Sequence, residues 1–321
     1  MAPAPARAHL FAGFAAVYIL WGSTYLAIRF AVESFPPFIM AGTRHLTAGL
    51  LLFAFLRARG VALPDRRHWK SAAIIGALLL LGGNGFVSWA EQRVPSGLAA
   101  LIVASVPIWM AIVQGVLRRR WPPAAVLAGL LIGLAGLVLL VLPGRFGGGE
   151  HVDPLGAAAL VFAALSWVIG SLYSRRAVLP RSTLLAIAIE MIAGGAILWI
   201  AGLTFGEGAR IQLAGISLRS VLSLAYLIVF GSLIGFSAYI WLLKVSTPAR
   251  VTTYAYVNPV VAVLLGWAFA GEALTVRIGL AAFAIVGAVA LIIRYGGEPS
   301  KKPALASPRT PERSLARENV S

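Results

Sequence analysis

Runs of about 20 apolar residues follow one another along most of this chain, and no other feature restricts the fold so strongly. A helix of about 20 residues spans the hydrocarbon of a bilayer. The runs do not alternate as barrel strands do, and they are about twice as long, so each is expected to cross the membrane as a helix. Ten runs qualify: Leu10–Ala31, Pro37–Leu56, Trp69–Trp89, Gly97–Leu117, Pro122–Leu142, Pro154–Tyr173, Thr183–Thr204, Leu222–Leu243, Val251–Ala270 and Val276–Tyr295.

Composition supports a membrane protein and excludes several other classes. Hydrophobic residues make up 60% of the chain and charged residues only 12%, against about 25% charged in soluble domains. The formal charge of +16 does not indicate a nucleic-acid partner, because the basic residues separate the apolar runs instead of forming a patch. The chain has no cysteine, and its four histidines are scattered. We therefore expect no metal site and no cofactor.

Basic residues fall unevenly on the connections between the runs. Twenty of the 27 lie on one set of alternate connections or on the two termini, and five lie on the other set. The positive-inside rule then predicts that both termini are cytoplasmic. The membrane itself is expected to be a bacterial inner membrane. The first run is longer than a signal-peptide core, so we interpret it as an uncleaved span behind a short N-terminus, 1–9. The polar tail, 296–321, is expected to be disordered.

The chain contains an internal repeat. Similar residues recur 146–152 positions apart, with one small insertion near Gly206–Ser217. Five is an odd number of helices, so a second copy must enter the membrane from the opposite side. The sequence therefore predicts an all-α membrane protein of ten transmembrane helices in two inverted five-helix repeats, 10–142 and 154–295, joined by an external linker, 143–153. The matched pairs are Trp21/Trp167, Arg44/Glu190, Gly83/Gly235, Pro107/Pro259 and Gly136/Gly287.

Polar, aromatic and proline residues within the spans are the candidates for a substrate pathway. Proline removes a backbone hydrogen bond, so the matched prolines predict midplane kinks with free carbonyls on Val103 and Ala255; packing alone is the alternative. Amides at membrane depth are expected to face inward. For any single aromatic residue, core packing and substrate contact are equally compatible with the sequence. The pathway candidates are Trp21, Tyr25, Asn84, Ser88, Pro107, Trp109, Trp167, Tyr239, Thr252, Tyr256, Asn258 and Pro259.

Arg44 and Glu190 are the ionisable residues farthest from the span ends. A lone charge at this depth costs several kcal/mol, so each needs a partner. Glu190 is the formal candidate for proton coupling. The alternative is a structural role, either as an ion pair or as two groups that are each bonded to the backbone. Glycines at 129, 133 and 136 would let another helix approach closely, either within the chain or in a homodimer.

The interior of the spans lacks the convergent acid, base or metal groups of an enzyme.

Five short segments, in order, resemble the EamA type of the drug/metabolite transporter superfamily. They are Trp21–Thr24, Arg44 after Pro36–Pro37, Pro95–Gly97, Tyr254–Pro259 and Gly271–Glu272. The resemblance covers about Leu10 to Tyr295. It implies a 5+5 inverted fold and efflux of small metabolites or amino-acid-like solutes, with a cavity near Trp21, Asn84, Pro107, Trp167, Tyr256 and Asn258. It also implies that Arg44 and Glu190 lie more peripherally.

These observations favour a secondary transporter that works by alternating access on a small amphipathic solute. A channel is one rival, and it would conduct without saturation. A non-transporting assembly factor or sensor is another, but such a protein would need a larger soluble segment than this chain has.

Overall fold

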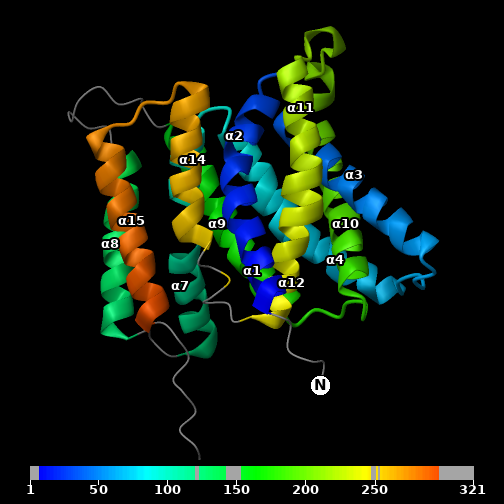
Figure 1. Ribbon diagram of the computed structural model, residues 1–321, viewed down its shortest axis with the longest axis horizontal. Helices are drawn as coiled ribbons and strands as arrows, with labels where there is room; N and C mark the ends of the chain where they lie inside the picture. Colours follow the sequence, from blue (N-terminus) through cyan, green and yellow to red (C-terminus); the bar gives the residue numbers. More distant parts are fainter. Residues whose placement is uncertain (1–6, 120–122, 142–152, 247–250, 252–253, 296–321) are drawn as a thin grey trace, which may run out of the picture.

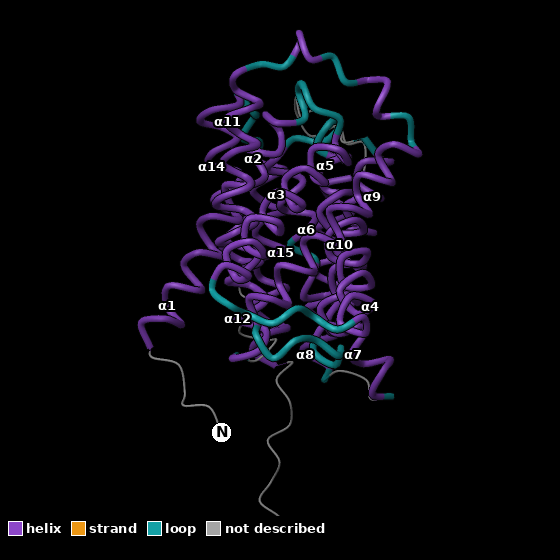
Figure 2. Tube along the Cα trace, turned by 90° about the vertical axis from the view of Figure 1, so that its right-hand side faces the viewer, coloured by secondary structure: helices purple, strands orange, loops and turns teal. Residues whose placement is uncertain are grey.

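The computed structural model describes residues 7–119, 123–141, 153–246, 251 and 254–295. All regular secondary structure within these ranges is helical. The main helices run mostly up and down beside one another (Figures 1 and 2). Three of them contain π-helical segments, named η1, η2 and η5. The elements are α1 (Arg7–Ala15), η1 (Ala16–Leu20), α2 (Trp21–Ala31), α3 (Pro37–Ala58), α4 (Arg66–Ile75), η2 (Gly76–Gly85), α5 (Phe86–Ala90), α6 (Ser96–Val103), α7 (Val106–Arg118), α8 (Ala124–Val141), α9 (Pro154–Ser174), α10 (Thr183–Thr204), two short 3₁₀ turns η3 (Glu207–Arg210) and η4 (Leu213–Gly215), α11 (Leu218–Tyr226), η5 (Leu227–Phe236), α12 (Ser237–Val245), α14 (Tyr254–Ala270) and α15 (Val276–Tyr295).

Seven helical stretches in the described part of the chain are long and apolar enough to cross a membrane. Three shorter apolar helices lie within α8, α14 and α15. The predicted run boundaries agree with the observed helices to within about four residues wherever the structure describes them, so the helical prediction is confirmed. The total of ten spans stays a prediction. The linker up to residue 152 and the tail after residue 295 lie outside the described residues.

Local signals explain where several helices begin. Pro37 and Pro154 occupy the first turns of α3 and α9, where a missing N–H removes no intrahelical bond. The Asp153 carboxylate accepts from the Leu155 amide at 2.9 Å, and the Ser182 and Ser217 hydroxyls cap α10 and α11 in the same manner. The predicted helix start at Pro122 lies outside the described residues.

The fourth predicted run is not one continuous helix. It is divided into α6 and α7 at Ala104–Ser105, and Pro107 is the second residue of α7. Proline supplies no amide hydrogen, so the chain closes the break with turn-like bonds, such as Ser105 N to Ile102 O at 3.1 Å. The kink predicted from Pro107 is confirmed. Pro259 instead lies inside an unbroken α14.

Helices from the two halves pack in pairs. α3 packs along α10, α8 along α15, and α6 along α14, while η2 packs against α9 and η1 against η5. Figure 1 shows α8 beside α15 at one end of the molecule and α3 beside α10 toward the other. A Cβ at Gly133 would meet Ile108 at 2.4 Å, and one at Gly136 would meet Ile285 at 2.9 Å. These two glycines therefore serve packing within the chain, and a homodimer stays a prediction.

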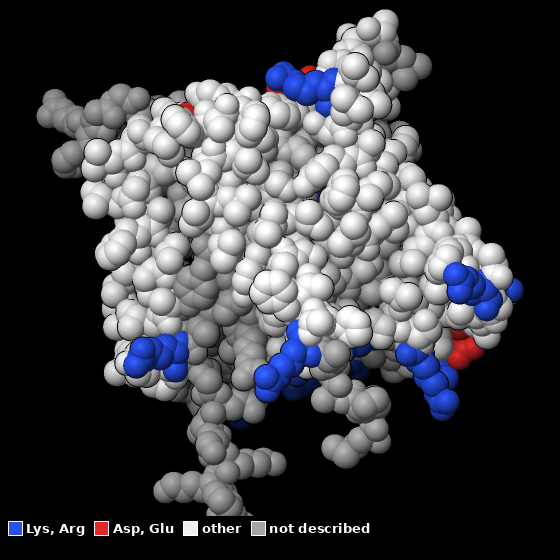
Figure 3. Space-filling model, in the orientation of Figure 1, with Lys and Arg blue, Asp and Glu red and all other residues white. Residues whose placement is uncertain are grey.

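Charged side chains are absent from a broad middle band of the visible face (Figure 3). On that face, Lys and Arg gather along the lower edge, with a smaller charged group at the top. Large apolar side chains are exposed on many helices, including Phe283 and Phe11. An apolar belt between charged edges suits a lipid environment, since lipid imposes no cost on exposed aliphatic surface.

Candidate functional site

A cavity of about 70 Å³ lies between the two halves. Seven helical segments contribute to it: α2, α3, η2, α5 and α6 from the first half, and α9 and α14 from the second. Its wall is mainly apolar and aromatic, with a few amide, hydroxyl and guanidinium groups, as is usual for small-molecule sites. The lining residues are Trp21, Thr24, Tyr25, Ile28, Arg44, Gly83, Asn84, Val87, Val103, Ala163, Ala164, Trp167, Tyr254 and Asn258.

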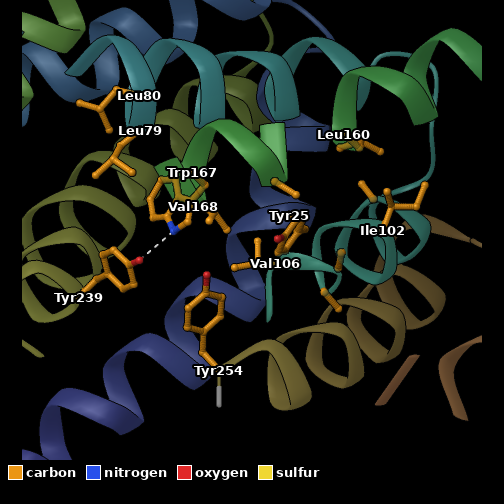
Figure 4. Close-up of a cluster of buried hydrophobic side chains, with 14 of the residues drawn as sticks. Tyr25, Leu79, Leu80, Ile102, Val106, Leu160, Trp167, Val168, Tyr239 and Tyr254 are labelled. Atoms are coloured by element: carbon orange, nitrogen blue, oxygen red, sulfur yellow. Dashed lines mark hydrogen bonds between the residues drawn. The ribbon is translucent and has the colours of Figure 1, made fainter. Parts of the chain in front are cut away.

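An aromatic cluster forms one side of this cavity. The Trp21 ring lies edge-on to Trp167 at 5.5 Å and to Tyr254 at 5.6 Å, and it is tilted against Tyr239 at 4.9 Å. Trp167 Nε1 donates to the Tyr239 hydroxyl at 3.0 Å, which in turn lies 2.8 Å from the Ser171 hydroxyl. In Figure 4, Tyr254 points toward the space between Trp167 and Tyr25. The hydrogen bonds and edge contacts hold these rings in fixed orientations.

Two glycines on π-helical segments make room for the two tryptophans. A Cβ at Gly83 of η2 would lie 2.7 Å from the Trp167 ring, and a Cβ at Gly235 of η5 would lie 2.4 Å from Trp21 Nε1. Trp21 Nε1 also donates to the Gly231 carbonyl at 3.2 Å, within η5. Carbonyls in π-helical stretches are irregularly bonded, so a side-chain donor there fixes the local geometry.

Asn84 and Asn258 face inward, as their positions predicted. Asn84 lines the cavity, and its backbone carbonyl accepts from the Ser88 hydroxyl at 2.9 Å. The Asn258 amide, in the orientation that suits its neighbours, donates to the Tyr18 carbonyl at 2.9 Å and to Val17 at 3.2 Å. Those carbonyls belong to η1, so Asn258 ties α14 of the second half to the first helix of the chain.

Arg44 lines the cavity, although the family resemblance implied a more peripheral place. It is 2% exposed, and its Nε donates to the Ser232 hydroxyl at 2.8 Å. Its Nη1 has no hydrogen-bond partner. A Cβ at Gly231 would lie 2.7 Å from Nη2, so glycine there leaves room for the guanidinium.

Glu190 is not the partner of Arg44. No ion pair joins them in the described part of the chain, and neither carboxylate oxygen of Glu190 has a hydrogen-bond partner. The charge that acts on Glu190 is Lys244 of α12. Lys244 itself donates to the Thr183 hydroxyl at 3.2 Å. The alternative of a structural ion pair between Arg44 and Glu190 is therefore wrong, because the two halves place these side chains in different surroundings.

The remaining predicted residues lie around the cavity or outside the described set. Ser88 and Tyr239 are buried behind its wall, and Trp109 Nε1 turns to the Ser105 hydroxyl at 3.1 Å. Pro107 creates the break after Val103, which lines the cavity. Thr252 and the side chain of Tyr256 lie outside the described residues.

Sequence reasoning missed the small and aliphatic part of the wall. Thr24 and Ile28 lie one and two helical turns after Trp21, and Ala163 lies one turn before Trp167. Their helical spacing from the tryptophans places them on the same faces, and this signal could have found them.

In the described part of the chain, no three His, Cys, Asp or Glu side chains are grouped closely enough to hold a metal ion.

Two glutamates of the second half bind helix N-termini of the first half, at the end of the molecule opposite α1 (Figure 1). Glu272 accepts from the Ser96 amide at 2.8 Å, the Ser96 hydroxyl at 2.6 Å and the Gly97 amide at 3.0 Å, at the start of α6. Glu207 accepts from the Phe38 and Ile39 amides at 3.3 and 2.9 Å, at the start of α3. Carboxylates stabilise helix N-termini through the free N–H groups and the helix dipole. We call these two contacts the outer clamps.

The sequence matches the EamA-like transporter family twice, over residues 8–142 and 154–294. The chain belongs to this family. It is 46% identical over 290 residues to the "uncharacterized inner membrane transporter YedA" of Escherichia coli strain K12, covering 88% of this chain and 90% of YedA. It is 24% identical over 274 residues to the "uncharacterized transporter YvbV" of Bacillus subtilis, covering 85% and 88% of the two chains.

These relatives of the EamA-like chain are named as transporters and not as enzymes. The "WAT1-related protein At3g02690, chloroplastic" of Arabidopsis thaliana is 26% identical over 259 residues, covering 79% of this chain and 62% of that protein. A solved crystal structure that is 24% identical has a TM-score of 0.62 and covers 88% of this chain and 96% of its own. That similarity supports the fold alone. The chain is thus a membrane transporter of the EamA-like family.

Proposed function

We propose that this protein is an alternating-access exporter of small amphipathic solutes. The observation that carries the proposal is the cavity between the two halves, walled by fixed aromatic rings and by the amides Asn84 and Asn258. Aromatic faces suit an apolar part of a solute, and the amides suit a polar part. Export as the direction follows the family resemblance.

Two inverted repeats of five helices would provide the moving parts. In support, the π-helical segments η2 and η5 lie 151 residues apart, on the third helix of each proposed repeat. The contacts of Trp21 with Gly235 and of Trp167 with Gly83 are also equivalent once the halves are exchanged. The family match in two consecutive segments points the same way. Rocking one such unit against the other exposes a midplane site to each side in turn.

The outer clamps would close the cavity at the external end when both termini are cytoplasmic. Each clamp joins a connection of the second half to a helix of the first half, so relative movement of the halves must break it. Multi-site contacts of this kind favour discrete closed and open states over continuous deformation.

Flux measurements in liposomes test the proposal against its rivals. We expect flux of amphipathic solutes into or out of proteoliposomes to saturate with concentration, since each cycle moves one bound molecule. Flux that rises linearly would indicate a channel. Absence of flux for amino acids, nucleobases and small aromatic solutes, with and without a pH gradient, would favour the non-transporting alternative.

Labelling tests the orientation and the inversion. The natural chain has no cysteine, so single cysteines can be introduced without removing others. We expect Arg67→Cys and Lys244→Cys, from the two halves, to react from the cytoplasmic side, and Arg210→Cys to react from outside. All three side chains are exposed. Labelling of Arg67→Cys and Lys244→Cys from different sides would contradict the inverted arrangement.

A further inference from the structure

Arg44 places a positive charge on the cavity wall with no carboxylate beside it. No ion pair of 4 Å or less involves Arg44 within the described residues. Its side chain is 2% exposed, and Nη1 lacks any hydrogen-bond partner. Buried guanidinium groups are usually paired, because they stay charged and lose hydration. An unpaired one beside an empty space indicates that something outside the chain supplies the partner.

The neighbouring charged groups do not neutralise Arg44 directly. Glu91, just beyond α5, is within electrostatic range, but its two buried carboxylate oxygens have no hydrogen-bond partner and form no ion pair with Arg44. Arg29 donates to the backbone carbonyl of Glu91. His45 Nδ1 lies 3.3 Å from the Ser232 hydroxyl, and an imidazole adds no negative charge.

The guanidinium is held in place before any solute arrives. Ser232 accepts from Nε at 2.8 Å, and Gly231 leaves room for Nη2. Both belong to η5, the π-helical segment whose Gly231 carbonyl also accepts from Trp21. The same segment thus positions the cationic group and the aromatic ring of the cavity. A fixed donor group binds its acceptor with less loss of conformational freedom.

We propose that the solute carried by this protein bears a carboxylate, which Arg44 binds in the cavity. The proposal rests on the proposed transport function and specifies its substrate class. The planar guanidinium matches a carboxylate through parallel N–H···O bonds. The apolar part of the solute would lie against Trp21 and Trp167. Small amphipathic organic acids, including amino-acid-like solutes, combine these two features.

Binding of small solutes to the purified full-length chain tests whether the substrate bears a carboxylate, without requiring transport. The probes are two pairs of nearly equal shape that differ in charge: phenylacetate with phenylacetamide, and hexanoate with hexanamide. The measurements are the melting temperature in detergent and the quenching of tryptophan fluorescence, since Trp21 and Trp167 line the cavity. We expect at least one carboxylate to bind tenfold or more tightly than its amide.

Variants at position 44 locate the charge. Arg44→Gln is expected to weaken carboxylate binding by roughly thirty-fold or more and to abolish the difference between acid and amide. Arg44→Lys keeps the charge but not the planar fork, so it should retain part of the preference. It also provides a readout if Arg44→Gln does not fold. Glu190→Gln is the matched control, because Glu190 holds the equivalent position in the second half, is buried and does not line the cavity.

The outcomes separate this inference from the transport proposal. Carboxylate binding that depends on Arg44 supports the inference, even if flux is absent. No preference for either carboxylate over its amide, or an undiminished preference in Arg44→Gln, would overturn it. Saturable flux of neutral solutes alone would overturn it as well, and would leave the transport proposal intact.

Discussion

The two halves of the molecule use the same tryptophan–glycine contact but surround it with different chemistry. Trp21 packs on Gly235, and Trp167 packs on Gly83, so each half offers a ring to the other. Beside these contacts, Arg44 reaches the cavity in the first half, whereas the equivalent Glu190 is buried elsewhere in the second. The comparison teaches that duplication maintains the backbone contact between helices, while side chains at matched positions are free to diverge.

The two ends of the molecule differ in a similar way. At one end, Glu272 and Glu207 bind helix N-termini across the halves. Residues 152 and 146 positions earlier in the chain are Arg120 and Val61, and neither bears a carboxylate. The sequence thus provides outer clamps without acidic counterparts at the other end.

Adding a methyl group at either matched glycine should have the largest effect. Gly83→Ala and Gly235→Ala each force a Cβ into a tryptophan ring, and overpacking of this kind costs about 1–3 kcal/mol. Both variants should lower the melting temperature in detergent by similar amounts. Gly279→Ala is the control, since nothing lies within 4 Å of a Cβ there. If one variant lowered the melting temperature strongly and the other did not, the two contacts would not be equivalent.

Removing an outer clamp should come next. Glu272→Ala deletes one carboxylate that accepts three part-buried hydrogen bonds. We expect the whole contact to contribute about 1.5 kcal/mol, the lower end for hydrogen bonds to a charged group, because water can replace the lost acceptor. We expect faster labelling of a Val103→Cys reporter in the cavity by a membrane-impermeant maleimide added outside. Glu207→Ala should act in the same direction but more weakly, because it loses two bonds. Unchanged labelling in both variants would show that these contacts do not close the cavity.

Replacing the tryptophans by phenylalanine should have a smaller effect. Trp21→Phe leaves the Gly231 carbonyl in η5 without its side-chain donor, at a cost of about 1 kcal/mol. Trp167→Phe should cost less, because the Tyr239 hydroxyl keeps its contact with Ser171. Melting temperatures of the two variants measure the difference. The reverse order would mean that the second half's ring contributes more to stability.

Glu190→Gln should have the smallest effect on transport. Glu190 does not line the cavity, and Lys244 is a charge that acts on it. We expect the flux and its pH profile to match those of the natural protein. The measurement uses proteoliposomes from about pH 5.5 to about pH 8.5, which covers the range on both sides of neutrality. A lost pH dependence would restore Glu190 as the proton-coupling residue.

Much of the fold followed from the spacing of apolar residues. The helices begin and end close to the predicted runs because the hydrocarbon thickness sets the length of a span and prolines or capping residues set its start. The break before Pro107 was also predictable, since proline cannot donate to the helix. The π-helical segments were not, because they arise from an extra residue per turn that packing stabilises and composition does not reveal.

The candidate site was only partly predictable. Trp21, Tyr25, Asn84, Trp167 and Asn258 stood out as polar or aromatic groups deep in the spans, and they line the cavity. The alanines and valines of its wall gave no chemical signal of their own. Tyr239 and Ser88 lie behind the wall, although their residue types suited it equally well.

By itself, the sequence determined that this chain crosses a membrane by helices, contains one unit twice, and places most of its basic residues on one set of connections and the termini. These are properties of residue type and order, which hydrophobic burial and backbone hydrogen bonding translate directly into structure. Only the tertiary structure decided that Arg44 reaches the cavity while Glu190 does not, and that Glu207 and Glu272 join the halves. Those outcomes depend on which helices pack together and how each is rotated, and residues more than 150 positions apart set both.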